Sequence, residues 1–179
     1  MSSPCDPRYA PVGDVGAALM MVDSQLKAVH NGGNAATDPE RQALVDQYTA
    51  SLGPREADDV LDGMCTLIFM FMRWLREAHE DQDKDVLAYV VPSLVATMRM
   101  MPKSCRPEAI PTMAGLVIAA GTGLSPNLWR EQFGDWTKEE LTALEATALL
   151  LAEHINRVTD DPDFATRLIT DALSRSEEL

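Results

Sequence analysis

Residues 64–72 read MCTLIFMFM, and Thr66 is the one polar residue among these nine. The run lies within a longer apolar pattern with spacings of three and four residues, made by Val60, Met64, Leu67, Phe71, Trp74 and Ala78. Such spacing is typical of an α-helix. A helix that is apolar on nearly every side belongs in the middle of a bundle. The sequence therefore predicts a buried central helix near residues 55–79.

Helical spacing continues on both sides of this segment, and two of the outer helices have long regular apolar stripes. The predicted helices cover approximately residues 15–29, 39–52, 54–79, 86–101, 113–120, 126–133, 138–158 and 162–173. We expect an all-α fold, a single-domain bundle of about seven to eight helices spanning residues 1–179. Residues 1–11 and 175–179 are expected to be flexible tails.

Three local features refine this prediction. Pro92 falls inside a predicted helix, where it removes one hydrogen bond and clashes with the preceding turn, so we expect a kink or a break there. Residues 113–120 are short and apolar, which fits a buried helix or a buried strand, and their alanines favour a helix. Thr137 and Glu140 have the spacing of a capping box, which predicts a helix start.

The chain is strongly acidic, with 28 Asp and Glu against 15 Lys and Arg and a net charge of −13. This balance argues against nucleic acid and anionic membranes as partners, because both are bound by clustered cations. With 46% hydrophobic residues, the chain is too apolar to be disordered. Its three cysteines are widely spaced, and the N-terminus lacks an apolar signal region, so we expect a cytoplasmic protein.

Motifs for catalysis are sparse. His30, His79 and His154 lie on three separate predicted helices, and neither H-E-x-x-H nor E-x-x-H occurs. The glycines of Gly121-Thr122-Gly123 lack the rest of a nucleotide-binding fingerprint and fit a helix end and turn. We therefore predict no catalytic residue, no metal site and no cofactor.

One acidic segment resembles a known motif. Asp58-Asp59-Val60-Leu61-Asp62 is similar to the DDxxD sequence of terpene synthases and prenyltransferases, over five residues. The resemblance implies aspartates that hold magnesium against a diphosphate. The same acids also suit the first turns of a helix, where the helix dipole favours negative charge. A metal-dependent enzyme is accordingly the third of three functional hypotheses.

Three sets of residues are candidates for binding. An apolar set could line a ligand pocket between helices, and it consists of Met64, Phe71, Leu94, Met98 and Met113. An aromatic set could form a core corner or anchor a partner, and it consists of Trp129, Phe133 and Trp136. A cationic set could receive an acidic partner segment or a small anion, or balance neighbouring carboxylates, and it consists of Arg99, Lys103 and Arg106.

The leading hypothesis is a non-enzymatic, acidic helical protein of regulatory or adaptor type. It would act through protein–protein interaction, with another protein or with itself as a homodimer, because its two long apolar seams are suited to helix pairing. The alternative is a sensor or carrier that binds an apolar small molecule between helices.

Overall fold

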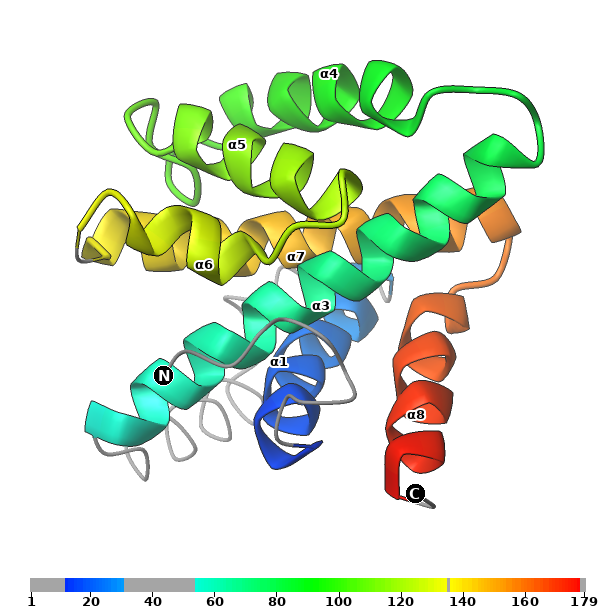
Figure 1. The fold of residues 1–179 in the computed structure, drawn as a ribbon, viewed down its shortest axis with the longest axis horizontal. Helices are drawn as coiled ribbons and strands as arrows, with labels where there is room; N and C mark the ends of the chain where they lie inside the picture. Colours follow the sequence, from blue (N-terminus) through cyan, green and yellow to red (C-terminus); the bar gives the residue numbers. More distant parts are fainter. Residues whose placement is uncertain (1–11, 31–53, 135, 178–179) are drawn as a thin grey trace.

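The computed structural model describes residues 12–30, 54–134 and 136–177. Within these residues the chain forms seven helices and no strand (Figure 1). The helices are α1 (Val12–His30), α3 (Pro54–Glu80), α4 (Val86–Arg99), α5 (Ile110–Gly121), α6 (Pro126–Glu131), α7 (Lys138–Thr159) and α8 (Phe164–Glu177). The predicted all-α bundle is confirmed, and residues 113–120 are helical. The predicted helix at 39–52 lies outside the described residues.

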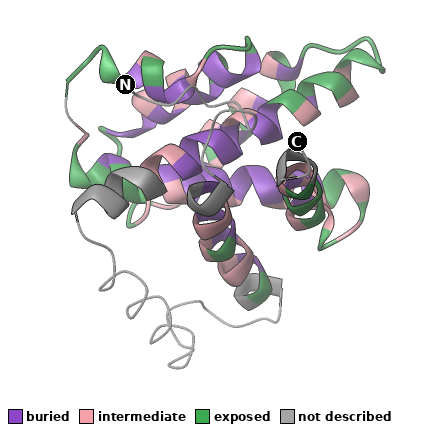
Figure 2. Cartoon of the chain, turned by 60° about the horizontal axis from the view of Figure 1, so that its bottom comes forward, coloured by how far each residue is buried: buried purple, intermediate pink, exposed green. Residues whose placement is uncertain are grey.

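Helix α3 is the central element, as predicted. It contacts all six of the other described helices, and residues 63–72 in its middle are buried, apart from the half-buried Phe69 (Figure 2). The fully buried large side chains of α3 are Leu67, Ile68, Phe71, Met72 and Leu75. Burying one such side chain stabilises a fold by about 1.5–3 kcal/mol, so this helix provides the largest part of the core.

Helix α7 is the second buried element, and it contacts α1, α3, α4, α5 and α8. Its buried face combines leucines with alanines. The small alanine side chains let neighbouring helices approach closely. The predicted capping box starts this helix: Thr137 Oγ1 accepts a hydrogen bond from the Glu140 amide (3.2 Å), and the Thr137 amide donates to Glu140 Oε1 (3.1 Å). At the other end of α7, Asp160 adopts a left-handed conformation with φ +52°.

Helix α4 runs unbroken from Val86 to Arg99, through Pro92. The buried face of the helix consists of Val86, Val90, Leu94 and Met98. Pro92 is exposed on the opposite side, and so is Ala88, whose carbonyl would accept from the amide that proline lacks. Water can therefore satisfy this carbonyl, and the helix is not broken at Pro92. The kink that was the other expected outcome stays a prediction.

Helices α5 and α6 form a tight pair joined by residues 122–125. Gly121, Thr122 and Gly123 form a helix end and turn, as predicted from the sequence. Thr122 caps α5, Gly123 has a φ of +88°, and Ser125 caps α6. The indole of Trp129 lies directly on Gly115: a Cβ at Gly115 would be 2.8 Å from Cζ2 of Trp129 and closer still to Cη2. The absence of a side chain at Gly115 therefore sets the spacing between α5 and α6.

We predict opposite effects of the same substitution at two helical glycines. Gly115→Ala forces Trp129 out of its place and should lower the free energy of unfolding by about 1–3 kcal/mol. Gly16→Ala meets no atom within 4 Å and should raise it by up to about 1 kcal/mol, because alanine is the better helix former. Urea denaturation measures both, and equal effects would contradict the close contact at Gly115.

Candidate functional site

A buried ion pair holds the corner between α6 and α7. Arg130 donates two parallel hydrogen bonds to Glu140, from Nε to Oε2 and from Nη2 to Oε1, each 2.7 Å long. Arg130 Nη1 also donates to the Gly134 carbonyl (2.9 Å), and the guanidinium lies 5.1 Å from the ring centroid of Trp136. Both charged residues are buried. The sequence analysis missed this pair, because ten residues and a turn separate its members.

Electrostatics at this corner favour the charged pair. The hydrogen bonds from Arg130 are the largest cause that holds the pKa of Glu140 below its usual range, and the backbone and hydroxyl of Thr137 act in the same direction. Burial opposes this shift but does not outweigh it. Glu140 thus pairs with a buried cation and caps α7 at the same time, so its role is to fix the corner.

The aromatic set divides between the core and the surface. Trp129 is half-buried on Gly115, and its ring meets that of Phe133 edge-on, with centroids 5.2 Å apart. Trp136 is half-buried against Arg130, and its indole nitrogen is buried without a hydrogen-bond partner among the described residues. Phe133 is 67% exposed. The two tryptophans therefore build the corner, and Phe133 is presented to solvent.

The apolar set lies in the core. Met64, Phe71, Leu94, Met98 and Met113 are all buried and belong to one hydrophobic cluster. A hollow beside Leu94 has a volume of about 20 Å³ and is also lined by Val90, Ser93, Thr97 and residues of α7. That space is close to the room of one water molecule. Binding of an apolar ligand by this set stays a prediction.

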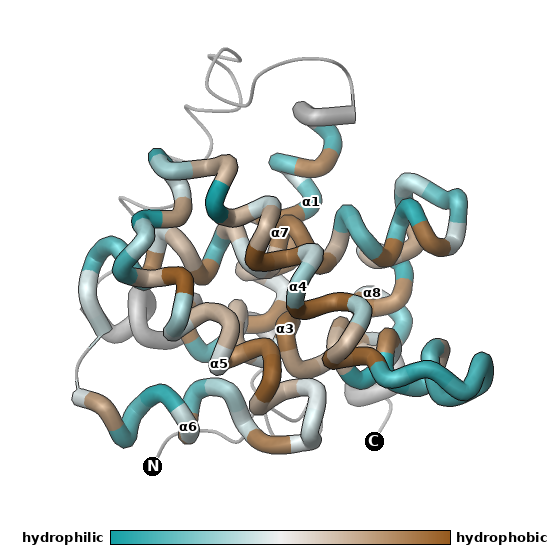
Figure 3. The backbone as a smooth tube through the Cα atoms, turned by 90° about the horizontal axis from the view of Figure 1, so that it is seen from above, coloured by the Kyte–Doolittle hydropathy of each residue, from teal (hydrophilic) through white to brown (hydrophobic). Residues whose placement is uncertain are grey.

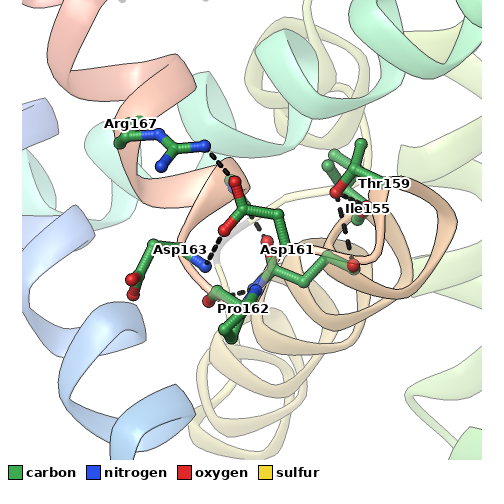
Figure 4. Close-up of polar contacts among 8 residues, drawn as sticks. Ile155, Thr159, Asp161, Pro162, Asp163 and Arg167 are labelled. Atoms are coloured by element: carbon green, nitrogen blue, oxygen red, sulfur yellow. Dashed lines mark hydrogen bonds and ion pairs between the residues drawn. The ribbon is translucent and has the colours of Figure 1, made fainter.

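Two larger hollows are open and lined by polar residues. One of about 260 Å³ lies beside the turn between α7 and α8, and one of about 300 Å³ lies where Gly121 and Thr122 face the start of α4. In the first, the Asp161 carboxylate accepts from the Asp163 amide (3.0 Å) and pairs with Arg167 (Figure 4). The hydrogen bond from the Asp163 amide is the main cause that lowers the pKa of Asp161. These bonds serve the turn itself.

The enzyme hypothesis requires His, Cys, Asp or Glu side chains that are close enough together to hold a metal ion. Among the described residues, no group of three or more His, Cys, Asp or Glu is placed to hold a metal ion. Asp62, the last acid of the DDxxD-like segment, accepts a hydrogen bond from the side-chain amide of Asn127. The side chains of Asp58 and Asp59 lie outside the described part of the chain. No helix in that part is both long and apolar enough to cross a membrane.

His154 is half-buried on α7. Burial is the largest cause that lowers its pKa, and nearby Arg157 and His79 act in the same direction. His79 binds the Leu75 carbonyl through Nδ1 (2.7 Å) at the C-terminal end of α3. The neutral form of His154 is thus the form that the fold accommodates.

The cationic set is exposed. Arg99 ends α4, and Lys103 and Arg106 follow in the connection to α5. Among the described residues, none of the three forms an ion pair, in contrast to Arg130 and Arg167. These cations are therefore available to bind an anionic group from outside.

Acidic residues are almost absent from one layer of the molecule. Residues 86–130 form α4, α5, their connections and all of α6 except its last residue, Glu131. They contain Glu108 as their single acid, and the other 27 acids lie elsewhere in the chain. With four cations this segment, here named the acid-poor layer, has a net charge of +3, and the remainder has −16. The scarcity of acids in this segment is countable in the sequence, but it is not a local motif and was not predicted.

The acid-poor layer also exposes large apolar side chains. Five of the nine exposed large apolar residues of the described chain belong to it, namely Tyr89, Met100, Ile118, Leu124 and Leu128. Figure 1 shows α5 between α4 and α6, consistent with the contacts that α5 makes with both. The layer is thus a surface on which apolar and cationic groups occur with Glu108 as the single carboxylate.

We predict that Glu140→Gln lowers the free energy of unfolding by about 3 kcal/mol, because it leaves the Arg130 guanidinium buried without its counter-charge. The matched control, Glu139→Gln at the exposed neighbouring position, should change it by less than about 0.5 kcal/mol. Adding Arg130→Met to Glu140→Gln should recover part of the loss. Urea denaturation of these four proteins and of the single variant Arg130→Met measures this, and a purely additive double variant would contradict the coupling.

We predict a loss of stability in mild acid that depends on His154. Its pKa is lowered in the folded state, so the unfolded chain binds a proton first as the pH falls. The contribution of His154 to the free energy of unfolding is fully present above the pKa of the residue in the unfolded chain, near 6.5. This contribution decreases as the pH falls from there to the lower pKa of the folded state. Thermal melts from pH 7.5 to 5.5 should show a shallower decrease for His154→Gln than for the wild type. Identical pH profiles would contradict the prediction.

The candidate site is therefore the acid-poor layer, with the cationic set at one end of α4 and the aromatic corner beside α6. In comparisons with known proteins, no family model, no curated protein and no solved structure matches this chain.

Proposed function

We propose that the protein acts by binding a protein partner through the acid-poor layer, as a non-enzymatic protein of regulatory or adaptor type. The observation that supports this most directly is the separation of charge: a surface layer with one acid in a chain that has 28. A layer of helices does not need a low content of acids in order to fold, because exposed acids are well tolerated on helices. A surface that becomes buried in a complex does need a low content of acids.

The physical reason is the cost of desolvation. A carboxylate that becomes buried without a counter-charge loses its hydration at a cost of several kcal/mol. Protein interfaces are accordingly poor in Asp and Glu and rich in Tyr, Met and Arg. The acid-poor layer fits this composition through Tyr89, Met100 and Arg99, and Met100 is 83% exposed.

The charge of the remaining chain favours a protein over a polyanion. The −16 outside the acid-poor layer repels nucleic acid and anionic membranes at long range, and three exposed cations are few against that field. A protein partner can place its own charges only where they are needed. A partner whose surface is basic around an apolar centre would meet this acidic chain faster. We include a cytoplasmic location in this proposal.

We predict that a photo-reactive amino acid incorporated in cells will form protein adducts at Met100 and Leu128 but not at Met20 and Val158. The first two positions lie in the acid-poor layer, and the other two are comparably exposed apolar residues of α1 and α7. Denaturing gels followed by mass spectrometry measure the adducts. Equal adducts at all four positions, or adducts at the control positions only, would refute the proposal.

A further inference from the structure

The outward side of α4 is uncharged between its two ends. Between Asp85, which caps the helix, and Arg99, which ends it, no residue carries a charge. Intervals of seven residues, which are two helical turns, separate Asp85, Pro92 and Arg99, and the same interval separates Tyr89 from Ala96. These five residues therefore share the face of α4 that is opposite its buried face. All five are exposed. We name these five residues the α4 ridge.

The two ends of the α4 ridge carry opposite charges. The acidic end consists of Asp81, Asp83 and Asp85, and the cationic end consists of Arg99, Lys103 and Arg106. All six are exposed, and none of them forms an ion pair within the described residues. Asp85 and Arg99 are 14 residues apart, a separation of about 21 Å along a helix. Figure 3 shows the hydrophilic residues 81–85 leading into an α4 that is mainly neutral to hydrophobic.

This arrangement is self-complementary. An interface between two identical chains related by a two-fold axis must match itself, with each end of the surface facing the other end. Two copies of α4 crossing antiparallel near Pro92 place the acidic end of each against the cationic end of the other. Ala88, Ser93 and Ala96 are small and exposed, which lets the two helices approach closely.

We propose that the α4 ridge binds a second copy of this chain, with the two α4 helices antiparallel. The inference rests on the proposed function and names the partner of one part of the acid-poor layer. A foreign acidic segment would satisfy the cationic end but would meet like charge at Asp81 and Asp83. A second copy satisfies both ends with the same surface.

The contact has an apolar centre and charged ends. Tyr89, Ala96 and Met100 supply exposed apolar surface, and burial of this surface stabilises the pair. The charged ends lie at the rim, where they set orientation and are screened by salt. Two copies that each carry a net charge of −13 also repel one another, and salt screens this repulsion as well as the attraction between the ends. The exchange of charges at the two ends, rather than the salt dependence, is the measurement that identifies the contact.

The test is a charge swap followed by mixing. One variant, Arg99→Glu with Lys103→Glu, gives the cationic end a net charge of −1. A second, Asp81→Lys with Asp83→Asn, gives residues 81–85, which also contain Lys84, a net charge of +1. Asp85 is kept because it caps α4, and Asn at 83 suits the positive φ of that residue (58°). Each variant alone meets like charge at both ends of the dimer. A mixture of the two restores opposite charges at both ends.

We expect the wild type to form dimers in sedimentation velocity near physiological ionic strength, and each variant to raise the dissociation constant at least about tenfold. An equimolar mixture, with one variant isotopically labelled, should give mixed dimers in native mass spectrometry. Arg73→Glu with Lys138→Glu is the matched control for the first variant, since it makes the same change in total charge at exposed positions outside the ridge. This control should dimerise nearly as the wild type does, and thermal melts check that every variant folds.

The inference is overturned by a wild type that stays monomeric, by charge variants that dimerise like the control, or by a mixture no better than its parts. A monomeric wild type whose Met100 photo-adduct contains another protein overturns the second copy but supports the proposed function. A monomer that forms no adduct at Met100 or Leu128 overturns both.

Discussion

The central physical constraint in this protein is that residues 64–72, in the middle of α3, are apolar on nearly every side. A helical segment of this kind cannot expose any face to water without loss of stability, so the other helices must surround it. The six remaining described helices do so, and α7 lies beside it as a second buried rod. The short helices α4, α5 and α6 complete the cover on one side. Their position, and with it the acid-poor layer, is a consequence of covering α3.

Covering α3 uses one face of each outer helix, and the opposite face is available for other interactions. The inner face of α4 contributes Val86, Val90, Leu94 and Met98 to the core. On the outer face, the residues between Asp85 and Arg99 are uncharged, and most of them are small and apolar. That outer face contributes nothing to the core, so its composition is unexplained by folding alone. An interface accounts for it, because surface that is desolvated on binding is best kept free of carboxylates.

Spacing predicted most of the fold but few of the contacts between distant residues. The 3–4 pattern located the helices, and Thr137 with Glu140 located the start of α7, because capping depends on neighbours within one turn. The same carboxylate also pairs with Arg130, and Trp129 lies on Gly115. Neither contact has a sequence spacing of its own, since each depends on how two helices are placed by the turn between them. A kink or a break at Pro92 was predicted from a local rule, and α4 is not broken there because the proline lies on its exposed face.

The amino-acid sequence by itself determined that the chain is helical, which helix is central and how charge is distributed along it, because these depend on local periodicity and composition. Only the tertiary structure decided which candidate residues are used in the core and which face solvent. Met64, Phe71 and Met113 became buried, whereas Phe133 and Arg99 were left exposed. The physical reason is that burial depends on the area that neighbouring helices cover, and that area is set by the packing of the whole bundle rather than by any one segment.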